Sequence, residues 1–304
     1  MSLKHVVVIG SSIEGQSAAL NLREEAPRTR ITLISEEEYP LYDRRKLTGF
    51  LAGRIREEEL FLCTKEYYRQ RQIDFLAGRV PAGINPVKKT VSFRRGAGFS
   101  YDLLVIASGL RVETPDIPGA RKPGAGPLWG LSDAKALTNR IFSDPLCLVA
   151  GDNAGLKIAR ALAERFRQEV KLIVPETLTS TDMPEEVEVL NTRIEEIIGE
   201  GQVQAVRITG GKVIGVSAVL FTEPRPSLDY LKGTPVTLDK GKVVVDENGR
   251  SSVPEIFACG ISAVRQGETA GNKSWDDCAS EGRRLASSLG ATISEMEQIC
   301  RKQS

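Results

Sequence analysis

The sequence predicts an α/β protein with two domains, each built around a strand, a tight turn and a helix. A β-branched run at residues 5–9 is followed by a glycine-containing turn and a helical segment. A second succession of strand, helix and strand occupies residues 146–174. The chain has 304 residues, which is enough for two domains of ordinary size. Strands that alternate with helices favour parallel sheets covered by helices.

The composition is that of a folded globular protein, and it argues against several classes of partner. Hydrophobic residues make up 41% of the chain and charged residues 27%, with a formal net charge of +1. This balance, without a long basic run, argues against nucleic acid or an anionic membrane surface as partner. No apolar stretch is long enough to span a bilayer. The chain enters its first strand almost at once, so we expect no signal peptide and a cytoplasmic location.

The cysteines and the single histidine lack the patterns of a metal site or a disulfide framework. The cysteines are odd in number and include no Cys-x-x-Cys pair. His5 stands at the start of the first strand, and an acid–base or metal role would need convergent partners. We therefore expect no metal, and we interpret His5 as a strand-edge residue. The cysteines are Cys63, Cys147, Cys259, Cys278 and Cys300.

The first strand leads into a turn with the spacing G-x-G-x-x-G, in which the middle glycine is replaced by serine. A helix through residues 17–26 and a second strand through residues 31–35 follow, and Glu36 and Glu37 come directly after that strand. This order is typical of a dinucleotide-binding βαβ unit. The expected cradle consists of Gly10, Ser11, Ser12, Ile13, Glu14 and Gly15.

Each part of this pattern has a chemical reason. Gly10 permits the tight turn, and Gly15 lets the helix pack closely against the strand. The position of Ser12 must let a pyrophosphate approach the backbone, and a serine hydroxyl is small enough to be a mild departure. The helix N-terminus offers N–H groups and a partial positive charge to the phosphates. Carboxylates at the end of the second strand accept hydrogen bonds from ribose hydroxyls.

The segment SEEEYPLYDRRKLTGFLAG at residues 35–53 resembles FAD-dependent pyridine nucleotide-disulfide oxidoreductases. The similar members are the nitrite-reductase flavin domain, ferredoxin and rubredoxin reductases, and apoptosis-inducing factor. The resemblance implies that Glu36 and Glu37 hold the adenosine ribose of FAD and that Arg44, which follows Tyr42, reaches the cofactor. The lysine that the family has five residues after this arginine is Gly49 here.

Further blocks resemble the same family. YDLLVIASG at residues 101–109 is similar to the strand that passes the FAD pyrophosphate, and PDIPGA at residues 115–120 to the linker between the domains. ENGRSSVPEIFACG at residues 247–260 is similar to the block in which the chain returns to FAD, and a helix at about 272–288 follows it. The positions that the resemblance assigns to FAD in these blocks and near the adenine are Val80, Ala107, Ser108, Gly109, Gly260, Ile261 and Trp275.

The resemblance also implies how the domains are interleaved. Residues 1–112 joined to 226–304 are expected to form the FAD-binding domain, and residues 113–225 a reduced NAD(P)-binding-like domain. The C-terminal dimerisation domain of larger members is absent from this plan, so the length resembles that of thioredoxin reductases. Where the family ends the late FAD block with a carboxylate, this chain has Ile261. The loss of one hydrogen bond would weaken FAD binding by about 0.5–1.5 kcal/mol.

The second nucleotide motif departs further from its pattern. Strands at 146–150 and 170–174 flank a helix at 154–166, but Ala150 and Asp152 replace two of the glycines. Two like charges about 4 Å apart repel by roughly 4 kcal/mol at an effective dielectric near 20, so Asp152 would oppose a pyrophosphate. The family's next helix is also missing before a strand at 187–198. We therefore expect NAD(P)H to bind weakly or not at all.

Two hypotheses for function follow. Under the first, the protein is an FAD-dependent oxidoreductase that passes electrons between NAD(P)H, or a partner protein, and a small electron carrier. Under the second, the protein is a non-enzymatic binding or electron-relay subunit of a larger complex, as the changes at Ser12, Gly49, Ala150, Asp152 and Ile261 suggest. The redox-active dithiol of the family is absent, and the cysteines nearest the late block are interpreted as small buried residues. Any catalysis would therefore come from the flavin.

Overall fold

A computed structural model describes residues 3–139, 146–149, 153–175, 185–269, 271 and 273–302. The chain divides into two compact units, which are described separately. Unit 1 comprises Met1–Tyr42, Phe61–Leu110 and Pro226–Ser304, and unit 2 comprises Asp43–Leu60 and Arg111–Arg225. Segment 43–60 therefore groups with unit 2, whereas the sequence analysis assigned it to the first domain.

Unit 1 is built on a five-stranded sheet whose neighbouring strands are all parallel, in the order β20-β7-β1-β2-β3. β1 lies at the centre, and Val6 to Ile9 are fully buried because both faces of the sheet are covered. The parallel strands are β1 (His5–Ile9), β2 (Arg30–Ile34), β3 (Ile73–Leu76), β7 (Leu103–Ile106) and β20 (Ile256–Ala258).

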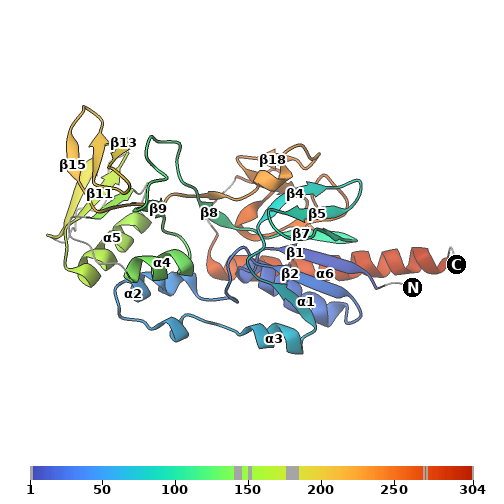
Figure 1. Ribbon diagram of the computed structural model, residues 1–304. Coiled ribbons are helices and arrows are strands. Elements are labelled where there is room, and N and C mark those ends of the chain that lie inside the picture. The colour runs from blue at the N-terminus through green and yellow to red at the C-terminus, as the bar shows by residue number, and fades with distance from the viewer. Residues whose placement is uncertain are drawn as a thin grey trace. The chain divides into compact units, whose positions relative to one another are not determined.

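Helices cover one face of this sheet and small antiparallel or mixed sheets cover the other (Figure 1). Val6 and Val8 of β1 pack toward α1 and α6, whereas Val7 and Ile9 pack toward the small sheets. The helices are α1 (Ile13–Glu25), α3 (Lys65–Gln70) and α6 (Trp275–Lys302). The small sheets are β4 (Pro81–Asn85), β5 (Thr90–Phe93) and β6 (Phe99–Ser100), and β18 (Leu238–Asp239), β19 (Lys242–Val245) and β21 (Ala263–Arg265).

Helices α1 and α6 approach each other very closely. A Cβ atom at Gly282 of α6 would stand 2.3 Å from the backbone oxygen of Glu14 and 2.9 Å from the Cβ of Ser17. Only glycine permits this contact without movement of the α1 backbone. The packing brings the middle of α6 against the N-terminal turn of α1, which is the part of the fold expected to receive a dinucleotide.

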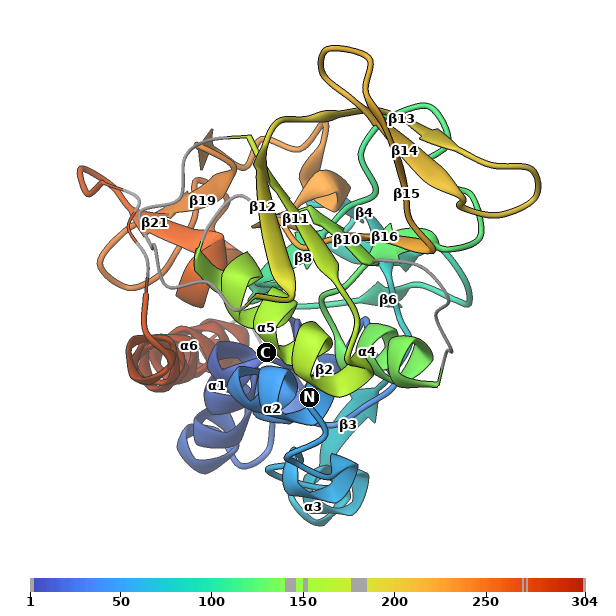
Figure 2. The ribbon, with the colours of Figure 1, turned by 90° about the vertical axis from the view of Figure 1, so that its left-hand side faces the viewer.

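Unit 2 repeats the parallel topology of unit 1. Its five-stranded sheet has the order β12-β11-β10-β16-β9 (Figure 2). All neighbouring strands are again parallel, and the central strand, β10, is followed along the chain by helix α5. A separate three-stranded sheet has the order β13-β14-β15. The strands are β9 (Ala125–Pro127), β10 (Leu146–Val149), β11 (Val170–Val174), β12 (Val187–Asn191), β13 (Ile194–Ile198), β14 (Ala205–Ile208), β15 (Val213–Gly215) and β16 (Ala218–Phe221). The helices are α2 (Leu47–Leu51), α4 (Leu131–Thr138) and α5 (Asn153–Phe166).

Short elements complete the described chain. Two strands at the junctions of the units, β8 and β17, pair in a two-stranded sheet. They and the 3₁₀ helices are β8 (Leu110–Val112), β17 (Pro224–Pro226), η1 (Arg44–Lys46), η2 (Glu57–Glu59), η3 (Asp229–Leu231) and η4 (Gly260–Ser262). No helix in the described part of the chain is both long and apolar enough to cross a membrane.

The α/β class is confirmed, but several expected element bounds were wrong. The single strand expected over 187–198 is two strands, β12 and β13, and the helix expected over 272–288 runs from Trp275 to Lys302. The first helix begins at Ile13, inside the nucleotide motif, rather than near residue 17. Ala150 and Asp152 lie outside the described residues, as do residues 176–184, where the missing helix of the family was sought.

Candidate dinucleotide site

The turn after β1 has a backbone that only glycine can adopt. Gly10 has φ +110°, and a Cβ atom there would stand 1.9 Å from the carbonyl oxygen of Ala107. Its N–H donates to the oxygen of Ile34 at 2.9 Å, which ties the turn to the end of β2. A Cβ atom at Gly15 would stand 2.0 Å from the oxygen of Gly10, so the helix starts directly against the turn. The two glycines act as the sequence analysis predicted.

Helix α1 begins at the edge of the sheet where the parallel strands end. The side chain of its N-cap residue does not bind the free backbone amides of the first helical turn. Ser12 is the N-cap in extended conformation, and its side chain makes no capping hydrogen bond. Instead its hydroxyl donates to the oxygen of Ala107 at 3.2 Å. The partial positive charge of the first turn therefore faces the edge of the sheet, where open α/β sheets bind phosphate groups.

The side chain of Glu14, in the first turn of α1, is almost completely buried at this edge. Only 3% of the residue is exposed. Its Oε1 lies 2.7 Å from the place of a Cβ at Gly260 and 3.8 Å from that of a Cβ at Gly109. Burial raises the pKa of the Glu14 carboxyl above its usual value, although a hydrogen bond from its own backbone opposes the shift. A carboxyl group thus lies between the loops that follow β7 and β20.

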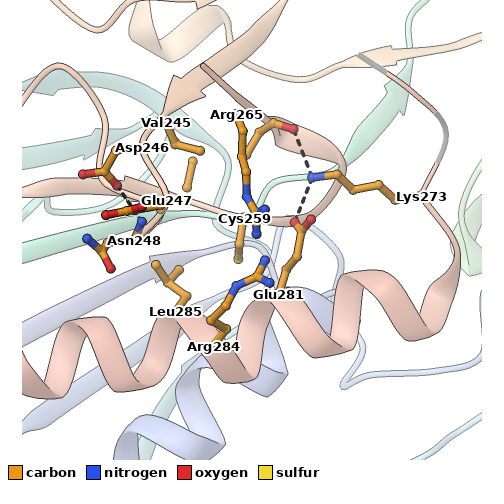
Figure 3. Close-up of a pocket in the computed structure, with 13 residues that line it drawn as sticks. Val245, Asp246, Glu247, Asn248, Cys259, Arg265, Lys273, Glu281, Arg284 and Leu285 are labelled. Carbon is orange, nitrogen blue, oxygen red and sulfur yellow. Dashed lines mark hydrogen bonds and ion pairs between the residues drawn. The ribbon is translucent and has the colours of Figure 1, made fainter. Parts of the chain in front are cut away.

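Side chains near and on α6 hold the loop after β20, in which Gly260 has φ +69°. The Gly260 N–H donates to Oε2 of Glu281 at 2.9 Å. The Lys273 ammonium donates to the same Oε2 at 2.8 Å, to the Gly260 oxygen at 2.9 Å and to the Ala263 oxygen at 3.2 Å. Figure 3 shows Lys273 reaching Glu281, which projects from α6. The loop is therefore held by three hydrogen bonds that Lys273 donates and by one that the Gly260 N–H donates to Glu281.

A cavity of about 20 Å³ lies beside this group of side chains, with Cys259, Lys273, Glu281 and Arg284 in its wall (Figure 3). A volume of this size holds about one water molecule. Ile261, the residue that replaces the family's carboxylate, is half-buried just past Gly260 and offers no hydrogen-bond acceptor from its side chain.

The loop after β7 is held by hydroxyl groups. The Ala107 N–H donates to the oxygen of Ile9 at 2.8 Å, and the Gly109 N–H donates to Oγ of Ser262 at 2.8 Å. Ser108 Oγ accepts from the Tyr230 hydroxyl at 2.9 Å and donates to the Ser227 oxygen at 3.1 Å. The structure therefore places Ala107, Ser108 and Gly109 at the same sheet edge as Gly10, as expected.

The two acidic residues after β2 have different surroundings. Glu36 is exposed, whereas Glu37 is half-buried and its Oε2 accepts a hydrogen bond from the Tyr42 hydroxyl at 2.7 Å. Tyr42 is itself buried and forms a β-bridge with Phe61. The hydrogen bond holds the Glu37 carboxylate against Tyr42, whereas the Glu36 side chain is exposed.

The remaining predicted positions, Arg44, Val80 and Trp275, differ in their surroundings. Arg44 belongs to unit 2, where Nη1 donates to the Trp129 oxygen at 2.8 Å and the guanidinium lies 5.1 Å from the Trp129 ring centroid. The Val80 oxygen accepts the backbone N–H of Arg94 at 3.0 Å. Trp275 is half-buried at the first position of α6. Contacts of these three residues with FAD stay predictions.

Gly49, which replaces the family's lysine, has a structural reason to be glycine. A Cβ atom there would stand 2.5 Å from Cδ1 of Ile55. Both residues belong to unit 2. A longer side chain at residue 49 would require the end of the Ile55 side chain to move.

The thiols near the site are not poised as nucleophiles. Cys259 and Cys278 are buried, as expected, and burial raises the pKa of Cys259 well above its usual value and that of Cys278 to about 12. Burial also raises the pKa of Cys63. His5 begins β1, and its Nε2 lies 2.9 Å from Oγ1 of Thr32. In the described residues, no group of three or more His, Cys, Asp or Glu side chains is arranged to hold a metal ion.

Sequence reasoning missed the residues that hold the loops at this edge. Ser262 and Tyr230 meet partners that lie 153 and 122 residues away along the chain. Lys273 and Glu281 lie 13 and 21 residues from Gly260, but they match no recognisable motif. The sequence analysis also treated Glu14 as an ordinary position of the cradle. The one available hint was the presence of a carboxylate directly before Gly15, where a pyrophosphate is expected.

The residues of unit 1 fit the pyrophosphate and ribose of FAD with two exceptions. The glycine turn, the N-terminus of α1 and the acids after β2 have the placement and chemistry that these groups need. Ile261 supplies no acceptor, and an ionised Glu14 would repel a phosphate. Neither exception blocks the turn itself, so the residues present fit a dinucleotide.

Comparison with known proteins gives a family match over most of the chain. A family model described as pyridine nucleotide-disulphide oxidoreductase matches residues 4–274. The chain is 27% identical over 293 residues to the benzene 1,2-dioxygenase system ferredoxin–NAD(+) reductase subunit of Pseudomonas putida, which covers 89% of this chain and 70% of that protein. It is 25% identical over 308 residues to the NADH oxidase of Methanocaldococcus jannaschii, covering 87% of this chain and 68% of that protein.

Solved structures show the same fold. The crystal structure of the covalent putidaredoxin reductase–putidaredoxin complex aligns with a TM-score of 0.81 at 21% identity, over 96% of this chain and 76% of that chain. The expected family resemblance is therefore confirmed. The expectation that NAD(P)H binds weakly or not at all is not supported, because the names of the sequence relatives include NAD(+) and NADH.

Proposed function

Because the chain belongs to the pyridine nucleotide-disulphide oxidoreductase family, we propose that it is an FAD-dependent oxidoreductase. It passes electrons between NAD(P)H, or a partner protein, and a small electron carrier. The observation that carries this proposal is the family match over residues 4–274, which includes a glycine turn with the geometry that a dinucleotide needs. The non-enzymatic alternative is not favoured, because the sequence relatives are reductases and an oxidase.

The protein's part in this function is to bind and orient the cofactor. FAD, when bound, supplies the acceptance of a hydride and the release of single electrons. The turn from Gly10 to Gly15 would receive the pyrophosphate at the N-terminus of α1, and Glu36 or Glu37 the ribose hydroxyls. The loops after β7 and β20 close the same edge, where Ser262 and Glu281 hold their backbone amides in place.

The proposed electron partners follow from the relatives. NADH is the proposed donor, since the relatives named above include a ferredoxin–NAD(+) reductase subunit and an NADH oxidase. A ferredoxin-type iron–sulfur protein is the proposed acceptor. A cytosolic location is part of the same proposal, and it is supported by the free thiols of Cys63, Cys259 and Cys278.

Reconstitution with FAD followed by anaerobic reduction tests the proposal. The purified protein is incubated with FAD, passed through a desalting column and examined for bound-flavin absorbance. NADH and NADPH are then added separately without oxygen, and we expect at least one to bleach the flavin. Addition of an oxidised [2Fe–2S] ferredoxin should restore the flavin absorbance and reduce the ferredoxin. A protein that binds no FAD under any condition would overturn the proposal.

A matched pair of variants locates the cofactor. Glu36→Ala should weaken FAD binding by about threefold to tenfold, as expected for the loss of one hydrogen bond. Glu24→Ala removes an exposed acid from α1, away from the end of β2, and should leave the affinity unchanged. Equal affinities in both variants would contradict the assignment of the ribose to Glu36.

A further inference from the structure

The buried carboxyl of Glu14 lies where the chain closes around the proposed pyrophosphate site. It belongs to the first turn of α1, four residues after Gly10, and is 97% inaccessible to solvent because only 3% is exposed. Its Cγ lies 2.5 Å and its Oε1 2.7 Å from the place of a Cβ at Gly260. A side chain at residue 260 would therefore collide with Glu14, and glycine leaves room for it.

Titratable groups face Glu14 from each neighbouring segment. Glu281 and Cys278 lie on α6, Lys273 precedes that helix, and Cys259 comes just before Gly260. The two thiols are neutral at physiological pH because burial raises the pKa of each. Lys273 is hydrogen-bonded to Glu281 at 2.8 Å. An ionised Glu14 would thus leave one net negative charge in this group.

That residual charge matters for an anionic ligand. The N-terminus of a helix attracts a phosphate, but an ionised carboxylate in the same helical turn opposes it. A protonated carboxyl carries no charge and can donate a hydrogen bond, which a carboxylate cannot. The approach of a pyrophosphate therefore favours the protonated form of Glu14 over the ionised form.

We propose that binding of a dinucleotide at the first site is coupled to the uptake of one proton by Glu14. This inference rests on the proposed function, because it requires that FAD binds to unit 1. The proton passes from solvent to the Glu14 carboxylate, and no other bond forms or breaks. FAD affinity then falls as pH rises, by up to about tenfold per pH unit over the range in which free Glu14 is ionised and bound Glu14 is protonated.

Calorimetry on the wild-type chain measures this coupling directly. FAD is titrated into the apoprotein at one pH in several buffers that differ in ionisation enthalpy, and the measurement is repeated from about pH 5.5 to 8.5. The slope of observed enthalpy against buffer ionisation enthalpy gives the number of protons taken up. We expect a value that rises toward one in part of this range, together with an affinity that weakens as pH rises.

A pair of variants assigns the proton to its residue. Glu14→Gln keeps the shape of the side chain without its charge, so uptake should disappear and FAD should bind about tenfold more tightly than to wild type at pH 8. Glu24→Gln makes the same chemical change at an exposed position of the same helix and should behave as wild type. Circular dichroism confirms that each variant is folded.

The outcomes separate this inference from the proposed function. FAD binding by wild type without proton uptake across the pH range overturns the role of Glu14 and leaves the proposed function intact. Uptake that persists in a folded Glu14→Gln variant also overturns it. Absence of FAD binding to wild type and to both variants at every pH overturns the proposed function, and this inference with it. If Glu14→Gln does not fold, the wild-type calorimetry still decides whether a proton is taken up.

Discussion

Two loops at the same edge of the unit 1 sheet are shaped in opposite ways. The loop after β1 is determined by what its backbone excludes, since a Cβ atom at Gly10 or Gly15 would stand about 2 Å from a backbone oxygen. The loop after β20 is determined by what side chains supply, since Lys273 and Glu281 bind the two backbone groups of Gly260. The first arrangement is steric and set by backbone atoms, and the second is electrostatic and set by side chains.

The difference has consequences for how each loop responds to change. A steric constraint admits no substitute residue, so alteration of the glycine turn should affect stability and ligand binding together. A hydrogen-bonded network can lose one member and relax, and solvent can replace part of it. We therefore expect the glycine turn to be the more sensitive of the two loops. The predictions below test this order, beginning with the largest effect.

Gly10→Ala should have the largest effect. The new methyl group would meet the Ala107 oxygen in a backbone conformation with φ +110°, and we expect a loss of about 3 kcal/mol in the free energy of unfolding from strain and overpacking together. Urea denaturation measures this loss, and FAD binding should fall with it. Gly267→Ala is the control, because Gly267 has φ +83° with no atom within 4 Å of the new Cβ. Similar losses in both variants would show that the close contact with Ala107 contributes nothing.

Gly282→Ala should have the next largest effect. The methyl group would press on the backbone oxygen of Glu14 at 2.3 Å and push α6 away from α1, at a cost of about 2 kcal/mol. Thermal unfolding measures the change. Gly290→Ala, on the same helix, meets only the Glu25 side chain at 3.2 Å and should be close to neutral, because alanine also favours the helix. A neutral Gly282→Ala would refute the close contact between the two helices.

Lys273→Met tests the network that holds the loop after β20. The change removes the ammonium that binds Glu281, the Gly260 oxygen and the Ala263 oxygen, and we expect a loss of about 1.5 kcal/mol because the pair is partly exposed. Chemical denaturation measures the loss. Lys302→Met removes an exposed lysine from the end of α6 and should leave stability nearly unchanged. If Lys273→Met costs as much as Gly10→Ala, the two loops do not differ in the way described above.

Ser274→Ala should have the smallest effect of the four. Oγ of Ser274 accepts the N–H of Asp277 at 3.1 Å, and Asp277 Oδ2 accepts the N–H of Ser274 at 3.0 Å, so the pair caps the start of α6. Loss of a helix N-cap costs about 1 kcal/mol. Thermal unfolding should show a small decrease in midpoint for Ser274→Ala and little or none for Ser274→Thr, which keeps the hydroxyl. An equal decrease in both would argue against the capping role.

Much of unit 1 was predictable because the informative contacts are close in sequence. The strand from His5 to Ile9, the turn at Gly10 and the second strand ending at Ile34 follow from β-branched runs and glycine spacing. The end of the late helix was wrong by more than ten residues, because Gly290 continues the helix instead of ending it. The expected strand over 187–198 was wrong for a related reason, since a short bend at Thr192 and Arg193 separates two strands of similar composition.

The candidate site divides along the same line. The sequence by itself determined the cradle from Gly10 to Gly15, since the need for glycine comes from contacts within one βαβ unit and its neighbouring strand. Only the tertiary structure decided that Glu14 is buried between Gly109 and Gly260 and that Lys273 and Glu281 secure the second loop. Glu14 lies far along the chain from Gly109 and Gly260, whereas Lys273 and Glu281 lie 13 and 21 residues from Gly260 without matching any motif. Their burial and charge depend on the packing of α6 against α1, which no local pattern of residues encodes.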